Sequence, residues 1–208
     1  YRVRLEREAT TGIKLSHSGI VRVFDLVTEG DKVGIVMELV EGSSLADIME
    51  KRNGPFDWSE IKDWIEELCE GLSYAHSQGV VHRDIKPDNI MIDNGGSVKI
   101  LDFGIAKLEE GSEGGRTKTG MGMGTVAYMA PEQYMDAKNV DGRADLYALG
   151  MMVYELLSGR LPWESGLTDF SVLDKKRDGE LLPLSQLRSG IARHISDAVE
   201  QSLSASSG

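Results

Sequence analysis

The stretch HRDIKPDN, from His82 to Asn89, is the most informative part of this sequence. It gathers two aspartates, a lysine and an asparagine between the pattern of a long helix and that of a short strand. Taken singly, each of these polar residues would most often be a solvated turn residue. Whether these residues are functional therefore depends on the elements around them and on two further motifs downstream.

A long amphipathic helix is predicted directly before this stretch. Asp57 with Glu60 three positions later resembles a capping box at its N-terminus, and Gly79 is placed to end it. Two short apolar runs, NIMID and SVKIL, follow the stretch, and the turn NGG between them predicts a small hairpin. The apolar residues of the helix recur along one face, at Ile61, Trp64, Ile65, Leu68, Leu72 and Ala75.

The N-terminal part of the chain predicts a small mixed unit. Leu5, Ala9 and Ile13 indicate a short amphipathic helix in residues 1–15. The runs IVRVFDLV and KVGIVMELV around TEGD predict a β-hairpin. We expect VEGSS to form a loop and Leu45 to Lys51 to form a short helix.

The C-terminal part predicts mainly helices. Residues 109–124 have little apolar periodicity and predict a long loop. Residues 145–158 are apolar nearly all round, which is typical of a buried helix, and two or three weaker helical patterns follow. A small mixed unit followed by a helical one places the chain in the α+β class.

Composition restricts the class of partner. The 208 residues carry a net charge of -11, which disfavours nucleic acid and anionic membrane surfaces as partners. The single cysteine, Cys69, lies in the apolar pattern of the long helix and is expected to be a small core residue. One cysteine cannot form an internal disulfide, which favours a reducing, cytoplasmic compartment. We also find no apolar stretch of membrane-spanning length.

Two further motifs follow in series. DFG, Asp102 to Gly104, comes directly after the second short strand, and GTVAYMAPE, Gly124 to Glu132, ends the long loop. With HRDIKPDN, they resemble the catalytic loop, the magnesium loop and the substrate-side loop of the protein kinase family. Their order and separation match that family as well. The resemblance implies a protein-kinase-like fold, with ATP and Mg²⁺ as cofactors.

The resemblance also implies a role for each polar residue. Asp84 matches the base beside the attacking hydroxyl. Lys86 matches a lysine near the transferred phosphate, where positive charge offsets developing negative charge. Asn89 and Asp102 match the ligands of Mg²⁺, which prefers hard oxygen donors.

The ATP-binding side is matched less completely. Glu8 matches the helix glutamate that pairs with a strand lysine, and Met37 matches the residue at the back of the adenine pocket. Glu38 to Val40 match the hinge, whose backbone groups would bond the adenine edge. Met91 matches the apolar floor beneath the adenine ring.

Three other residues are expected to be structural. By resemblance, His82 and Phe103 pack under the site, and Asp145 holds the catalytic loop from the buried helix. In the long loop, Thr117 or Thr119 is expected to be autophosphorylated. By the same resemblance, Arg83 would then bind the phosphate.

Some family features are absent from the sequence. No G-x-G-x-x-G loop and no strand lysine precede Glu8, and the arginine that pairs with Glu132 does not follow the last helices. We therefore expect residues 1–40 to be a remnant of the ATP-binding small lobe. Residues 41–208 would form the helical catalytic lobe, with its C-terminal end truncated. Whether this chain is active alone stays open.

The favoured function is transfer of the γ-phosphate of ATP to serine and threonine hydroxyls of proteins. Lys86 followed by Pro87, and Thr125 in GT-x-x-Y, resemble the serine/threonine branch, while PEQ and VDGRADLYALG resemble bacterial members. Self-association would accompany autophosphorylation. One alternative is a kinase-like module that only binds partners. An antibiotic phosphotransferase is disfavoured because those enzymes lack the HRD-x-K-P and APE patterns.

Overall fold

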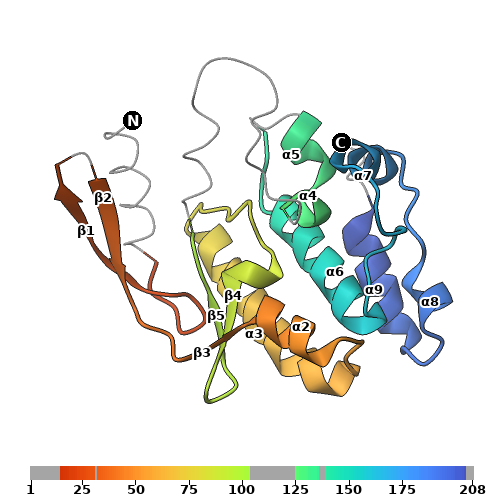
Figure 1. The fold of residues 1–208 in the computed structure, drawn as a ribbon, viewed down its shortest axis with the longest axis horizontal. Helices are drawn as coiled ribbons and strands as arrows, with labels where there is room; N and C mark the ends of the chain where they lie inside the picture. Colours follow the sequence, from red (N-terminus) through yellow and green to blue (C-terminus); the bar gives the residue numbers. More distant parts are fainter. Residues whose placement is uncertain (1–14, 31, 104–124, 136–138, 205–208) are drawn as a thin grey trace.

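The computed structural model describes residues 15–30, 32–103, 125–135 and 139–204 (Figure 1). The predicted N-terminal helix and the loop of residues 109–124 therefore lie almost wholly outside the described residues. The strands form two separate antiparallel sheets, a hairpin of β1 and β2 and a sheet in the order β3-β4-β5. Their bounds are β1 Val23–Glu29, β2 Lys32–Met37, β3 Gly42–Ser44, β4 Ile90–Asp93 and β5 Val98–Ile100.

The other regular elements of the described residues are helical. Figure 1 shows them to one side of the β1-β2 hairpin, with the three-stranded sheet between. The described helices are α2 Leu45–Arg52, α3 Trp58–Ser77, α4 Thr125–Tyr128, α5 Pro131–Met135, α6 Arg143–Ser158, α7 Asp169–Arg177, α8 Leu184–Leu187 and α9 Arg193–Leu203, with a 3-10 turn at Pro87–Asn89. This mixture confirms the predicted α+β class. The domain boundary after residue 40 stays a prediction.

The two predicted hairpins are confirmed, but the expected loop at VEGSS is wrong. Gly42–Ser44 forms the edge strand β3, which pairs with β4 through Gly42↔Asp93 and Ser44↔Met91. A strand of three residues is too short to show the alternation by which strands are recognised. At Gly42 an added Cβ would lie 2.1 Å from the Ile92 carbonyl oxygen, so only glycine permits this close pairing.

Helix α3 follows its predicted pattern closely. Its N-terminus is capped as expected, with the Asp57 amide donating to Glu60 Oε2 at 2.8 Å. It ends next to Gly79, which has the left-handed φ of 73° that favours glycine. The expectation for Cys69 is wrong, because the thiol is exposed. Leu68 and Leu72 face the core, and the position after Leu68 is rotated by about 100° away from it.

Helix α6 is the centre of the helical part. Most of its residues are buried, as its sequence predicts, and it packs against α3, α4, α8 and α9. Two acidic residues, Asp145 and Glu155, interrupt its apolar surface. Because a buried carboxylate needs partners, each of them marks a position where the chain is held by a polar contact.

The β4-β5 hairpin rests its apolar face on the core. Ile90, Ile92, Val98 and Ile100 are buried, while the alternate residues Met91 and Lys99 lie opposite each other on the other face. Residues 19–21 join the hairpin through the amide of Val21, which donates to the Ile100 carbonyl at 2.9 Å. The hairpin is thus anchored on one face and available for other contacts on the other.

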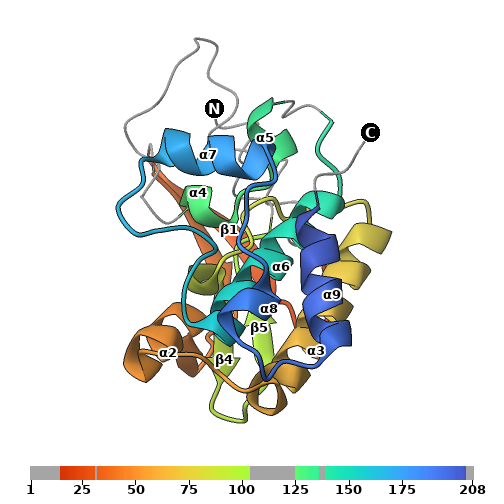
Figure 2. The same ribbon diagram turned by 90° about the vertical axis from the view of Figure 1, so that its right-hand side faces the viewer.

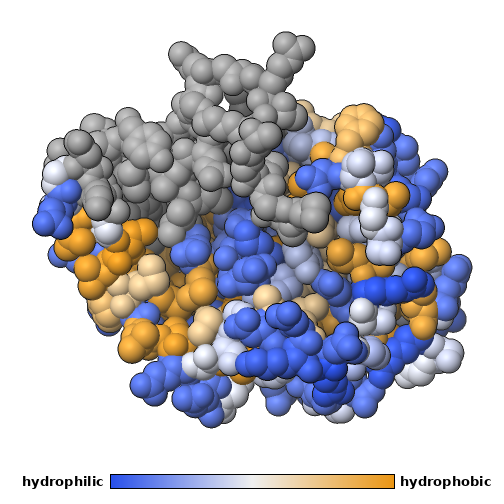
Figure 3. All heavy atoms as spheres, viewed as in Figure 1, coloured by the Kyte–Doolittle hydropathy of each residue, from blue (hydrophilic) through white to orange (hydrophobic). Residues whose placement is uncertain are grey.

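Large apolar side chains are exposed on the β1-β2 hairpin and the segment after it. They are Phe24, Val27, Val36, Met37 and Leu39. Figure 3 shows an apolar area on this side of the molecule. Within the described residues, none of the helices combines the length and apolar character that a membrane span requires.

Candidate active site

Two of the predicted site residues, Asn89 and Asp102, lie near each other because of hairpin geometry. In an antiparallel hairpin the start of one strand lies beside the end of the other, and here Ile90 pairs with Ile100. Asn89 directly precedes β4, and Asp102 follows β5 by two residues. The amide of Leu101 donates to the Asn89 carbonyl at 2.8 Å, which joins the two loops. The catalytic-loop and DFG motifs therefore share one edge of the sheet.

Asp84 is the centre of a small polar cluster. Lys86 Nζ lies 2.9 Å from Asp84 Oδ2. Asn89 Nδ2 donates to the same Oδ2 at 3.0 Å and to the Asp84 carbonyl at 2.7 Å. Asp84, Lys86 and Asn89 are thus brought together as the sequence predicts. Both side-chain contacts use Oδ2, so among the described residues Asp84 Oδ1 keeps its lone pairs available.

His82 supports this cluster from below. Its Nε2 donates to the Leu101 carbonyl at 2.7 Å, while its Nδ1 accepts from the Asp84 amide at 3.2 Å. This pair of bonds selects the neutral tautomer with the proton on Nε2. The ring also packs edge-on against Phe103, with centroids 4.6 Å apart. The prediction that His82 and Phe103 pack under the site is confirmed.

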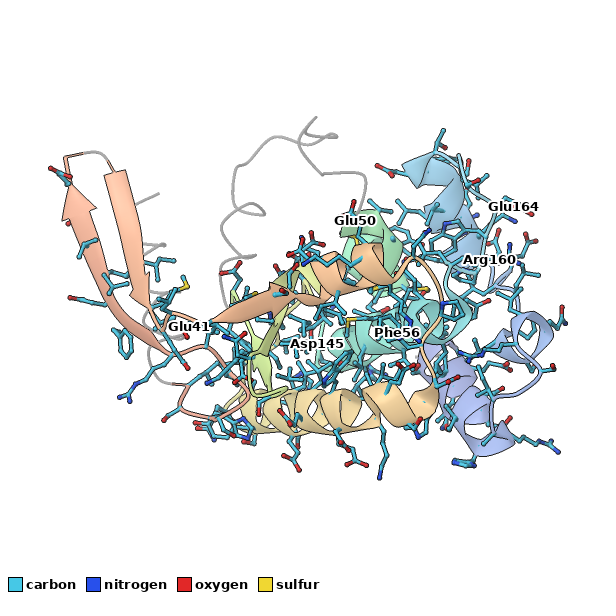
Figure 4. All side chains as sticks on the ribbon, turned by 60° about the horizontal axis from the view of Figure 1, so that its bottom comes forward. Glu41, Glu50, Phe56, Asp145, Arg160 and Glu164 are labelled. Carbon is cyan, nitrogen blue, oxygen red and sulfur yellow. The ribbon has the colours of Figure 1, made fainter. Side chains whose placement is uncertain are left out.

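Asp145 holds the catalytic loop by its backbone. The carboxylate is fully buried and accepts from the amides of His82 at 2.9 Å and Arg83 at 2.7 Å, which confirms its predicted role. Its Oδ2 also lies 2.7 Å from His76 Nε2 on α3, a contact that the sequence did not indicate. Figure 4 shows Asp145 in the interior of the helical part, above α3.

The backbone is strained at one residue of the catalytic loop and at one residue of the DFG loop. Arg83 and Asp102 have left-handed φ values of 70° and 59°, which are uncommon outside glycine. Gln133 stabilises the first of them, because its Nε2 donates to the Arg83 carbonyl at 2.7 Å. Its Oε1 in turn accepts from the Ala130 amide at 3.0 Å. Gln133 therefore connects the APE motif to the catalytic loop, a role that the sequence did not indicate.

The expected hinge carries an ion pair. Glu38 Oε1 lies 2.7 Å from Lys99 Nζ, and Glu38 Oε2 accepts from the Arg22 amide at 3.1 Å. The Lys99 hydrogen bond holds the pKa of Glu38 below its usual value. Because Met91 lies opposite Lys99, it shares the face of the β4-β5 hairpin from which Lys99 reaches Glu38. Met37 ends β2 and Val40 lies between β2 and β3. Glu8 lies outside the described residues.

The oxygen donors suit Mg²⁺. Asn89, which contacts Asp84, directly precedes β4, and Asp102 follows β5, whose end lies beside the start of β4. Mg²⁺ prefers hard oxygen donors of the kind that Asn89 and Asp102 carry. In the described ranges, no three His, Cys, Asp or Glu side chains form a metal-holding group. A site with one carboxylate and one amide fits an ion that takes its remaining ligands from phosphate and water. Asn89 and Asp102 are the residues that would hold it.

The structure thus places His82 under a cluster of Asp84, Lys86 and Asn89, beside the loop that carries DFG, as the three sequence motifs predict. The protein kinase domain model matches residues 2–203. The chain belongs to the protein kinase family.

Curated relatives agree with this assignment. A probable serine/threonine-protein kinase of Corynebacterium efficiens is 41% identical over 197 residues, covering 92% of this chain and 29% of the relative. The probable serine/threonine-protein kinase PknB of Corynebacterium glutamicum is 43% identical over 177 residues, covering 83% and 27%. The serine/threonine-protein kinase PknL of Mycobacterium tuberculosis is 35% identical over 198 residues, covering 95% and 48%. The chain thus spans less than half the length of each relative.

Asp145→Asn should destabilise the protein by about 2–3 kcal/mol. The asparagine NH₂ group would face at least one of the three nitrogens that now bond the carboxylate, leaving a buried donor unpaired. Urea unfolding of the two proteins measures the difference. Asp141→Asn is the matched control, since its carboxylate is exposed and pairs only with Arg143 at 3.1 Å among the described residues. An equal, small effect of both changes would contradict the role of Asp145.

Proposed function

We propose that this chain is the catalytic part of a serine/threonine-protein kinase that transfers the γ-phosphate of ATP to protein hydroxyls. The observation that carries the proposal is the cluster of Asp84, Lys86 and Asn89 at the sheet edge where the loop with the DFG aspartate begins. The names of the curated relatives support the choice of serine and threonine as acceptors. Bacterial signalling is the setting that these relatives favour.

In the proposed mechanism Asp84 is the base. Its Oδ1 accepts the proton of the serine or threonine hydroxyl as the hydroxyl oxygen attacks the γ-phosphorus. Oδ2 is occupied by Lys86 and Asn89, which fix the plane of the carboxylate. Lys86 also brings positive charge beside the phosphate as negative charge moves toward the leaving oxygen. When bound, Mg²⁺ would offset phosphate charge from its ligands Asn89 and Asp102.

The remaining site residues have proposed roles on the nucleotide side. Backbone groups of Glu38 to Val40 would bond the adenine edge, with Met37 behind the ring and Met91 beneath it. The Glu38–Lys99 ion pair, at 2.7 Å, supports this arrangement because it ties the hinge to the strand that leads into DFG. Glu8 would complete the phosphate clamp with a strand lysine. We place this reaction in the cytoplasm, where ATP is available.

Binding of Mg-ATP tests the function directly. In the full-length protein, Mg-ATP at about 100 times its dissociation constant should raise the melting temperature by roughly 5–10 °C. It should also support transfer of labelled γ-phosphate to a serine or threonine peptide. The 208-residue chain, measured in parallel, shows whether these residues bind ATP by themselves. The contrary outcome is that Mg-ATP does not raise the melting temperature of the full-length protein and that no phosphate is transferred. In that case the chain is a module that only binds partners.

A further inference from the structure

Lys176 on α7 is a buried lysine that the reaction just described does not use. It is 2% exposed, although lysine is almost never fully buried without a partner. No carboxylate among the described residues contacts its ammonium group. Such a charge is costly to bury, so its other contacts must stabilise it.

Those contacts are three backbone carbonyls and two aromatic rings. Lys176 Nζ donates to the carbonyls of Val126, Ala127 and Met129 at 2.9, 2.6 and 2.8 Å. It also lies 5.2 Å from the Tyr147 ring centroid and 5.5 Å from that of Trp163, within the range of cation–π attraction. The three acceptors match the three N–H donors of an ammonium group, whereas a neutral amine has only two. The geometry thus suits the charged form, although burial lowers the pKa of Lys176 to about 7.

The three carbonyls belong to the substrate-side motif. Helix α4 has a single turn, so its last carbonyls lack partners within the helix. A cation at a helix C-terminus is also favourable for the helix dipole. Figure 2 shows α7 lying beside α4 and α5, although α7 follows them by more than thirty residues. Lys176 therefore caps α4 from a distant part of the chain.

A second contact holds the same segment from below. The Tyr128 hydroxyl donates to Glu155 Oε2 on α6, and burial raises the pKa of the Glu155 carboxyl. Residues 126–129 are thus held by one acidic and one basic side chain from two different helices. The loop with Asp84 has its own supports in Asp145 and Gln133. Gln133 also accepts from the Ala130 amide, but the contacts of Lys176 and Glu155 with residues 126–129 are not shared with the loop that carries Asp84.

We propose that Lys176 is a positioning residue that holds residues 126–129 in the shape that receives the protein substrate. The inference rests on the proposed function, since it assigns this segment to the substrate side. Loss of the lysine would release three carbonyls and relax the segment, while Asp84 and the nucleotide side keep their supports. The affinity for substrate should then fall more than the affinity for ATP.

The test compares Lys176→Met with Lys175→Met in the full-length protein. Lys175 is the adjacent lysine, pairs with Glu180 at 3.8 Å on the surface, and provides the same change in charge. Lys176→Met should raise the KM for a serine peptide about tenfold or more, with the KM for ATP within about a factor of two. Lys175→Met should leave both constants near those of the wild type.

Hydrogen exchange gives a readout that does not require activity. The amides of residues 126–130 should exchange faster in Lys176→Met than in the wild type, with no change in Lys175→Met. Lys176→Gln keeps two N–H donors, so the rise in peptide KM and the faster exchange should both be smaller in this variant. If Lys176→Met does not fold, Lys176→Gln is used for the test in its place. An unchanged peptide KM with unchanged exchange, or an equal rise in both KM values, would overturn the proposal. A wild-type protein that transfers no phosphate would instead refute the proposed function.

Discussion

Replacing Asp84 by asparagine should lower phosphate transfer by about 10²–10⁴-fold in the full-length protein, as expected for the loss of a positioned base. The amide cannot accept the hydroxyl proton at its nitrogen. If its NH₂ group replaces Oδ2, it faces Lys86, which pairs with Oδ2, and Asn89, which donates to Oδ2. ATP binding should hardly change, because the proposed nucleotide contacts lie elsewhere. The decrease in phosphate transfer should therefore appear as a lower kcat.

Asp88→Asn is the matched control for this change. Asp88 is an exposed aspartate in the same loop, so the variant removes an equal charge four residues from the base. Initial rates at saturating Mg-ATP, with melting temperatures of both variants, separate chemistry from folding. Activity of Asp84→Asn within about a factor of two of wild type would remove Asp84 from the mechanism.

Replacing Asp102 by alanine should abolish activity and weaken Mg-ATP binding together. A carboxylate that holds the metal on the phosphates contributes to binding and to the transition state alike. The Mg-ATP rise in melting temperature should therefore disappear in this variant. Removing Mg²⁺ with a chelator should produce the same loss in the wild type.

The backbone at Asp102 requires a second variant. Its φ of 59° is tolerated better by aspartate and asparagine than by alanine. Asp102→Asn keeps this tolerance and removes the charge, so it should lose Mg-ATP binding with a smaller loss of stability. Asp63→Ala, at an exposed position on α3, is the control for charge alone. Full-strength Mg-ATP binding by Asp102→Asn would show that Asp102 is not the metal ligand.

Regular elements were predictable where the pattern is long. Helix α3 is 20 residues long, and it was recognised together with its capping and terminating residues. Helix α6 was recognised because it is apolar nearly all round. The edge strand β3 was missed because three residues carry no period. Cys69 was wrongly predicted to lie in the core. The apolar stripe of α3 is narrower than its sequence suggested, and the residue after Leu68 lies outside it.

The sequence by itself determined which residues the proposed chemistry uses. Asp84, Lys86 and Asn89 lie close along the chain, so one motif names them together, and DFG names Asp102. Local spacing can also predict a hairpin, and the hairpin brings the ends of its strands together. That step from motif to site required only short-range geometry.

Only the tertiary structure decided how the site is held. Asp145 binds the Arg83 amide, which is 62 residues away in the sequence. Gln133 binds the Arg83 carbonyl and Lys176 binds the Val126 carbonyl, each across 50 residues of sequence. Periodicity shows which side of an element is apolar, but it does not show which distant backbone atoms a buried polar group will meet. Those partners arise when helices α5, α6 and α7 pack, because packing brings buried charges to the carbonyls and amides that satisfy them.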